Sequence, residues 1–146
     1  MHIPMPAALF LCTCLGAHAA ADEQHIGLIK NVSGAVRVER GGATLAADPG
    51  MQLRVSDRLV SGPADTAGVV FRDGTLLSVG PSSVVHLRDY VFEPKQSRYR
   101  FDLFLAKGSA VYASGKIGKL SPESVRVDTP AATVGVRGTR FLIQAE

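Results

Sequence analysis

Cysteine and tryptophan are almost absent from this chain of 146 residues, which has no Trp and only Cys12 and Cys14. Two cysteines alone cannot complete a zinc centre, which needs four ligands. Apolar residues nowhere recur at helical spacing over ten or more positions, and Leu, Glu and Lys do not dominate, which argues against a helical bundle or a coiled coil. The net charge of +3 is small and its charges are well mixed, so we expect no nucleic acid partner.

Hydrophobic residues make up 46% of the chain, which excludes an intrinsically disordered protein. The length fits one domain and leaves little room for a second. The 15 glycines and 8 prolines indicate a chain with many turns.

Charged side chains are missing from residues 1–21, where an apolar run at residues 7–15 is followed by Gly16 and several alanines. This layout is typical of a secretory signal peptide, with cleavage near Ala19 or Ala21. The apolar run is too short to span a bilayer as a helix. The segment departs from the usual pattern in one respect, because it has no Lys or Arg at its start. We therefore expect residues 1–21 to be a signal peptide and residues 22–146 to be the mature domain.

Two other interpretations of the first segment are open. A buried N-terminal helix is disfavoured by Pro4, Pro6 and Gly16. Lipid attachment wants a small residue before the cysteine, and Leu11 and Thr13 fit poorly there. We expect a mature protein in the periplasm or outside the cell, with no cysteine and no integral membrane segment.

Short strands separated by glycine turns account for the rest of the sequence. Asp73-Gly74 predicts a hairpin with a two-residue loop, which would pair Phe71 with Leu76 and Val70 with Leu77. Both faces of that hairpin would be apolar, so we expect both to be covered.

Further along the chain, residues 98–106 alternate apolar with polar, Lys107-Gly108 predicts a turn, and residues 115–121 read as a basic loop. Strands spaced by about ten residues predict one all-β domain of short antiparallel strands, in a β-roll, a solenoid-like fold or a sandwich.

Candidate chemical groups are few. His86 and Asp89 would point to opposite faces of a strand, so no metal site is expected there. Ser82 or Ser83 with His86 lacks a nucleophile elbow and a well-placed acid. The loop at residues 114–119 lacks Walker spacing, and we interpret the Arg-Gly-Thr-Arg run at residues 137–140 as structural rather than as an anion site. We expect no catalytic, cofactor or metal residues.

The chain resembles the FecR-like domain family. The segments that carry the likeness are GAVRV (34–38), VSDRLVSG (55–62), VFRDGTLLSVG (70–80), FLAKGSAVY (104–112) and VDTPAATVGVRGTRF (127–141). The last segment is the most specific, and the likeness covers roughly residues 26–143. The family-motif positions, interpreted as structural, are Asp73, Gly74, Gly80, Gly108, Thr129, Pro130, Val136, Arg137, Gly138, Thr139 and Phe141.

The resemblance implies a non-catalytic all-β domain in the periplasm or outside the cell. The best-known members relay a signal from an outer-membrane receptor to a sigma factor, and we do not expect that role to carry over to this chain. Well-known members also carry a cytoplasmic anti-sigma segment and a membrane helix, and we expect this chain to act without either. The function it implies is an exported binding, signalling or assembly module; the alternative is an exported hydrolase or other enzyme with an unrecognised site. Family domains usually continue past the RGTxF motif, so we expect a strand at residues 134–143 to leave an edge for an envelope protein or a second copy.

Overall fold

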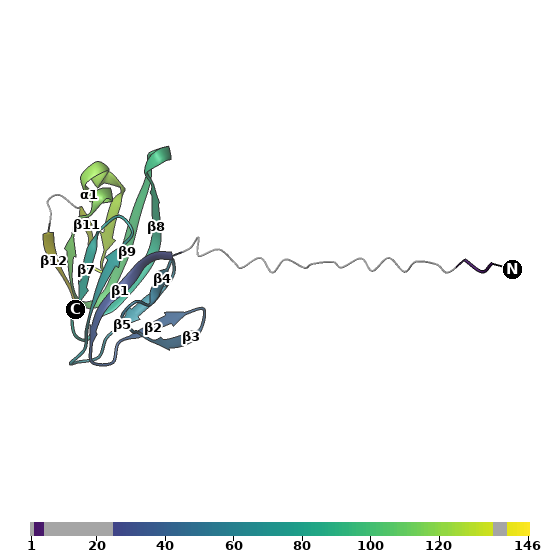
Figure 1. The fold of residues 1–146 in the computed structure, drawn as a ribbon. Coiled ribbons are helices and arrows are strands. Elements are labelled where there is room, and N and C mark those ends of the chain that lie inside the picture. Colours follow the sequence, from purple (N-terminus) through teal and green to yellow (C-terminus); the bar gives the residue numbers. More distant parts are fainter. Residues whose placement is uncertain (1, 5–24, 136–139) are drawn as a thin grey trace.

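The computed structural model describes residues 2–4, 25–135 and 140–146, and β-strands dominate these ranges (Figure 1). The predicted signal peptide, and the motif positions Val136, Arg137, Gly138 and Thr139, lie outside the described residues. The strands are β1 His25–Ser33, β2 Arg37–Arg40, β3 Ala43–Ala46, β4 Gln52–Arg54, β5 Arg58–Val60, β6 Thr66–Phe71, β7 Leu76–Val79, β8 Val84–Glu93, β9 Arg98–Ala113, β10 Val125–Asp128, β11 Thr133–Gly135 and β12 Arg140–Ala145. One short α-helix, α1 Lys116–Leu120, and two 3-10 turns, Pro94–Gln96 and Pro122–Ser124, complete the described elements.

The strands form one curled sheet in the order β3-β2-β5-β8-β9-β7-β6-β1-β4, and the pairing is antiparallel throughout this path. The prediction of a single all-β domain is confirmed. Within the described part of the chain, no helix is long and apolar enough to cross a membrane.

Strand β9 joins the two halves of the sheet. Its first part pairs antiparallel with β8 and parallel with β10, whereas its second part pairs with β7 on one side and β12 on the other. The change of partners falls at Gly108, which has φ +91°. The predicted turn at Lys107-Gly108 is therefore wrong, because the glycine bends one long strand instead of ending it.

The Asp73-Gly74 hairpin differs from its predicted register by one residue. Val70 pairs with Leu76 and Val69 with Leu77, and the loop has three residues, 72–74. The Phe71 carbonyl accepts a hydrogen bond from the Gly74 amide at 3.0 Å, and Gly74 alone takes a positive φ, at +87°. This is a type I turn followed by a left-handed glycine.

The shift of register also changes which side chains the hairpin buries. Val69, Phe71 and Leu77 all face the core, whereas Leu76 is 41% exposed on the outer face. The expectation that both faces of the hairpin are covered is therefore wrong, because the outer face of this sheet is open.

The core lies on the concave side of the curled sheet, where β9 contributes the predicted alternation of Phe101, Leu103 and Leu105. An aromatic cluster links the two halves of the sheet through successive ring contacts with centroid distances of 4.9–5.6 Å; its members are Phe71, Tyr90, Phe101, Tyr112 and Phe141. Burial of these large rings is a major source of the stability of the domain.

Candidate functional site

Asp73 is buried at the hairpin loop and fastens α1 to the sheet. Its carboxylate accepts hydrogen bonds from the Thr75 hydroxyl at 2.7 Å, the Tyr90 hydroxyl at 3.0 Å and the Ile117 amide at 3.0 Å. The Asp73 carbonyl also accepts from the Lys116 amide at 2.9 Å. The basic loop predicted at residues 115–121 is thus a short helix whose first turn is held by a buried carboxylate.

The surroundings of Asp73 keep Tyr90 protonated. Burial raises the pKa of the Tyr90 phenol, and the nearby Asp73 carboxylate raises that pKa further. The phenol accepts from the Asp73 amide at 2.9 Å while donating to the carboxylate, so it acts as a structural hydrogen-bonding group.

Ser83 lies where the bend of β9 meets the turn after β7. Its hydroxyl accepts from the Ser109 amide at 2.9 Å and lies within hydrogen-bond distance of two carbonyls, those of Pro81 at 3.0 Å and Ser109 at 3.1 Å. A side chain at Gly80 would overlap Ser109, and one at Gly108 would overlap Ser83. The motif glycines therefore permit close backbone packing, and Ser83 is engaged structurally.

A bulge in β8 changes the geometry predicted for His86. The register with β9 shifts between Leu87 and Asp89, so His86, Arg88 and Asp89 all lie on the outer face. The premise that His86 and Asp89 occupy opposite faces is wrong, because the bulge inserts one residue between them. Partial burial lowers the pKa of His86, as do the charges of Arg58 and Arg88. In the described ranges, no group of three or more His, Cys, Asp or Glu side chains could hold a metal ion.

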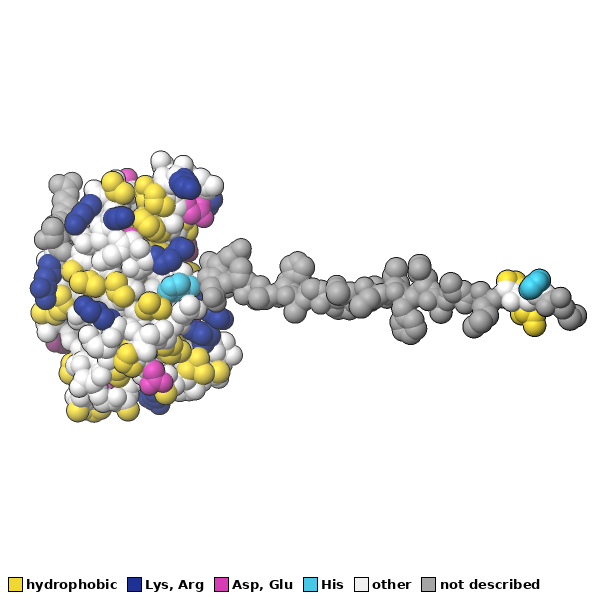
Figure 2. Space-filling model, in the orientation of Figure 1, with side chains coloured by type: hydrophobic (Ala, Val, Ile, Leu, Met, Phe, Trp, Pro, Cys, Tyr) yellow, Lys and Arg dark blue, Asp and Glu magenta, His cyan; other side chains and the backbone are white. Residues whose placement is uncertain are grey.

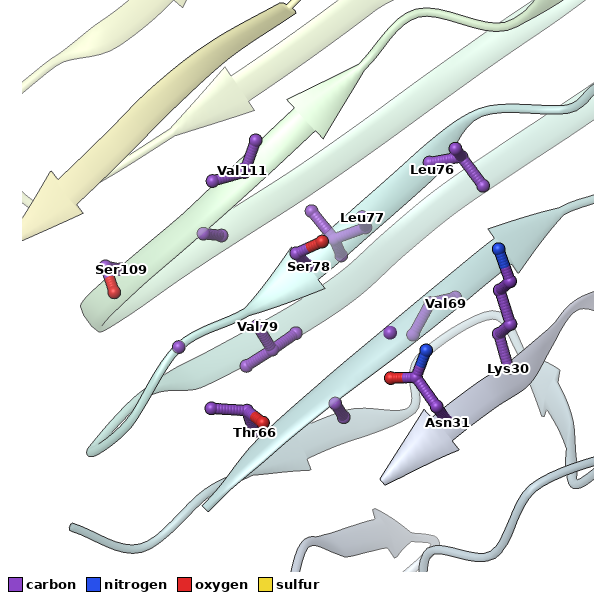
Figure 3. Close-up of a pocket in the computed structure, with 14 residues that line it drawn as sticks. Lys30, Asn31, Thr66, Val69, Leu76, Leu77, Ser78, Val79, Ser109 and Val111 are labelled. Carbon is purple, nitrogen blue, oxygen red and sulfur yellow. The ribbon is translucent and has the colours of Figure 1, made fainter. Parts of the chain in front are cut away.

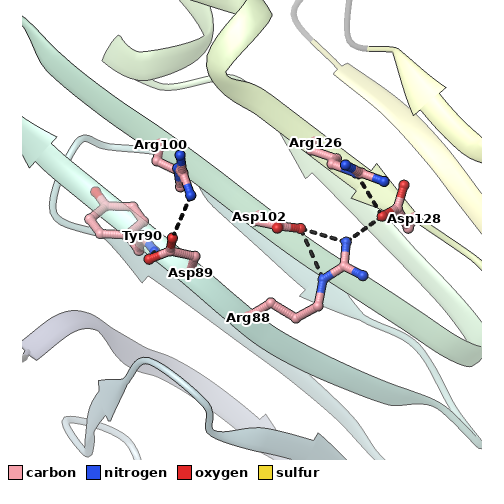
Figure 4. Close-up of polar contacts among 7 residues, drawn as sticks. All are labelled: Arg88, Asp89, Tyr90, Arg100, Asp102, Arg126 and Asp128. Carbon is pink, nitrogen blue, oxygen red and sulfur yellow. Dashed lines mark hydrogen bonds and ion pairs between the residues drawn. The ribbon is translucent and has the colours of Figure 1, made fainter.

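Arg88 links three strands on that outer face (Figure 4). Its guanidinium donates to Asp102 on β9, with Nε at 2.9 Å, and to Asp128 on β10. Asp128 also accepts from Arg126 Nε at 2.8 Å, and the Arg88 guanidinium lies 5.3 Å from the centre of the Phe104 ring. These hydrogen bonds hold the pKa of Asp128 at about 2, below its ordinary value of 3.8.

More ion pairs continue across the same face. Arg100 pairs with Asp89 at 3.0 Å, and Arg58 on β5 pairs with Glu39 on β2 at 3.6 Å. Basic and acidic groups thus neutralise one another on this surface. A surface of paired charges is better suited to holding strands in register than to attracting a polyanion.

The low pKa of Asp128 predicts a pH-dependent contribution to stability. Because the pKa is lower in the folded chain than in the unfolded chain, the contribution is fully present above about pH 5 and is lost as the pH falls through about 2. The free energy of unfolding that separates the wild type from Asp128→Asn should therefore be constant above about pH 5 and shrink toward pH 2. Urea unfolding at a series of pH values measures this difference.

Arg88→Met serves as the control for this prediction, because it removes the hydrogen bond that lowers the pKa of Asp128 most. In the Arg88→Met background, Asp128→Asn should show a weaker dependence on pH. Parallel unfolding curves for the wild type and Asp128→Asn down to pH 2 would contradict the assignment.

A shallow groove of about 340 Å³ crosses the outer face of β1, β6, β7 and β9 (Figure 3). Lys30 and Asn31 border it on β1, and Ser78 and Val111 lie on the opposite strands. Gly68 contributes no side chain, and the side-chain amide of Asn31 lies over it. Among the described residues, Lys30 is the one ionisable side chain that lines the groove, so these residues bring together no acid and base for proton transfer.

Strand β12 lies at an edge of the sheet, next to β9 (Figure 1). Within the described residues it pairs with β9 alone, where Leu142 lies opposite Val111 and Arg140 opposite Ala113. Ile143 is buried, whereas Leu142 is 60% exposed. Figure 2 shows hydrophobic side chains interspersed with Lys and Arg on the visible face of the molecule. Of the strand predicted at residues 134–143, residues 134–135 lie in β11, which pairs with β10, and residues 140–143 lie in β12, which pairs with β9. Residues 136–139 lie outside the described residues.

The family-motif positions occupy several places in the fold rather than one site. Asp73 and Gly74 form the hairpin loop, and Gly80 and Gly108 lie at the bend of β9. Thr129, with Pro130 beside it, opens the turn between β10 and β11, where its amide donates to the Ala132 carbonyl at 2.8 Å. Phe141 stacks on Tyr112 at 4.9 Å.

The polar groups that the sequence reasoning missed are Arg88, Asp102 and Asp128. They are distant in sequence, and strand pairing brings them together. The bulge at Arg88 leaves no clear mark in the sequence pattern of β8.

Comparison with known proteins places this fold in a family. The family model described as FecR protein matches residues 57–146, which include the hairpin, the long strand β9 and β12. The chain belongs to the FecR family. The match begins at Asp57, so the resemblance suggested for residues 34–38 lies outside it. No curated protein and no solved structure matches the chain.

Proposed function

We propose that this chain is an exported, non-catalytic interaction module of the bacterial envelope, which binds protein through β12. Membership of the FecR family supports this, since a FecR domain is typical of a signalling or binding module. The partner is an envelope protein or a second copy of the chain.

The observation that carries the proposal is the character of β12. An edge strand presents unpaired N–H and C=O groups that can accept another strand. Protective devices such as Pro or charged side chains are absent from residues 141–145, and Leu142 is largely exposed. Addition of a strand here would cover Leu142 and satisfy the free backbone groups.

The engagement of the potential catalytic groups supports a non-catalytic role. Ser83 is hydrogen-bonded to backbone groups, Asp73 holds α1, and His86 lies beside two arginines whose charges lower its pKa. A nucleophile and its general base need to lie within hydrogen-bond reach of each other. Here the hydroxyl of Ser83 is hydrogen-bonded to the backbone of Ser109 on β9.

Export rests on the composition of residues 1–21, with their apolar run and the small residues that follow. The exported protein should begin at Ala20 or Asp22. The interaction and the export can be examined on one sample, namely the periplasmic fraction of cells that express the chain.

The experiment compares Leu142→Lys with Leu120→Lys. The two leucines are matched in exposure, at 60% and 62%, but Leu120 lies on α1. We expect the wild type to run on a native gel as a high-mass complex. A lysine on an edge strand opposes strand addition, so Leu142→Lys should abolish this complex. Its melting temperature should stay within a few degrees of that of the wild type. Leu120→Lys should leave the complex intact.

Mass spectrometry of the same band gives the N-terminus. Equal loss of the complex in both variants, or no complex in the wild type, would contradict the proposed role of β12. An intact Met1 on a cytoplasmic protein would contradict export.

A further inference from the structure

We infer that the occupant of β12 is a second copy of this chain, paired antiparallel about a two-fold axis through Ile143. In this register Arg140 of each copy faces Glu146 of the other copy. The inference rests on the proposal that β12 binds protein, and it identifies the partner and the register.

The alternation of β12 restricts the possible registers. Arg140, Leu142, Gln144 and Glu146 are exposed, whereas Ile143 is buried between the partly buried Phe141 and Ala145. Residues that lie directly opposite in an antiparallel pair share a face of the sheet. A symmetric pairing must therefore place exposed positions opposite exposed positions, which excludes every register whose paired residue numbers add to an odd sum.

Three even registers remain near the centre of the strand. A sum of 284 places Leu142 opposite itself and Arg140 opposite Gln144, with no ion pair. A sum of 288 places Leu142 opposite Glu146, so that an apolar side chain faces a charged one. A sum of 286 pairs Arg140 with Glu146, Leu142 with Gln144 and Ile143 with Ile143.

Charge complementarity selects the register with the sum of 286. Among the described residues, neither Arg140 nor Glu146 takes part in an ion pair within its own chain. Opposed side chains on an antiparallel pair have Cβ atoms about 5 Å apart, so an Arg and a Glu there reach each other. The two-fold axis makes this contact twice. An ion pair between Arg140 of one copy and Glu146 of the other then lies at each end of the pair of β12 strands.

The same register also extends the core. Phe141 faces Ala145 of the other copy, and the two Ile143 side chains meet on the concave side. Both inner faces are thereby continued across the interface, which is the behaviour expected of an isologous contact.

Charge reversal tests the register by sedimentation of the purified protein. Arg140→Glu places two acidic side chains opposite each other at both ends, and Glu146→Arg places two basic side chains there. Each single variant should raise the dimer Kd by about tenfold or more. An equimolar mixture of the two variants should restore association, because every contact in the mixed dimer joins opposite charges. The chain that carries both substitutions should also dimerise.

Lys30→Glu is the control, because it reverses a basic charge that is also exposed but lies on β1, away from β12. It should leave the dimer Kd unchanged. A mixture that dissociates as readily as the single variants would overturn the register, and a wild type that stays monomeric at millimolar concentration would overturn the dimer. In the latter case, a periplasmic complex that is lost in Leu142→Lys would still support the proposed function with a different partner.

Discussion

Replacement of Asp73 by alanine is expected to lower the free energy of unfolding by about 3–4 kcal/mol. The carboxylate is buried, and it accepts hydrogen bonds from Thr75, Tyr90 and the amide of Ile117. The variant would leave these donors without their acceptor in a region that water does not reach. Helix α1 should also detach from the hairpin, because its first turn loses the group that holds it.

Urea unfolding of Asp73→Ala, with Asp48→Ala as the control, measures this effect. Asp48 lies in an exposed turn, so its replacement should change stability by less than about 0.5 kcal/mol. Asp73→Asn should also destabilise, because an amide has one acceptor oxygen where the carboxylate has two. Similar midpoints for Asp73→Ala and Asp48→Ala would show that the buried network contributes little.

Gly108→Ala is expected to lower the free energy of unfolding by a comparable amount, about 2–5 kcal/mol. Part of the cost is the positive φ of +91°, which an alanine adopts poorly. The rest comes from overlap with Ser83, whose hydroxyl and backbone lie where the new methyl group would go. Because Ser83 is tied to the backbone of Ser109, it has little freedom to move.

Gly42→Ala separates the two causes in a thermal unfolding experiment. Gly42 also has a positive φ, at +81°, but an added Cβ there meets open space. It should therefore show the conformational cost alone, about 1–2 kcal/mol. If Gly108→Ala costs no more than Gly42→Ala, the close packing at the bend of β9 is not a source of stability.

The sequence predicted the fold class and the strongest strand well. The alternation in residues 98–106 predicted which side of β9 is buried, because a two-residue period has one interpretation in a sheet. It did not predict the path of β9, since a lysine followed by glycine is equally compatible with a turn and with a bend inside one strand. Only the neighbouring strands, which change at Gly108, distinguish the two.

The hairpin shows a similar limit. The dipeptide Asp73-Gly74 indicates a turn, but the loop length decides the register, and the buried side chain of Asp73 favours the three-residue loop by holding Thr75 and α1. That contact joins residues 44 positions apart, so a local pattern could not reveal it. The bulge at Arg88 likewise depends on Asp102 and Asp128, which come from other strands.

Site-specific photo-crosslinking in living cells shows whether β12 is the interaction surface. A photoreactive side chain replaces Leu142 in one strain and Leu120, which is equally exposed, in another. We expect a crosslinked adduct from position 142 and none from position 120, and peptide mapping of a dimer should join residues 140–146 of two chains. Adducts from position 120 with none from position 142 would show that β12 is not the interaction surface.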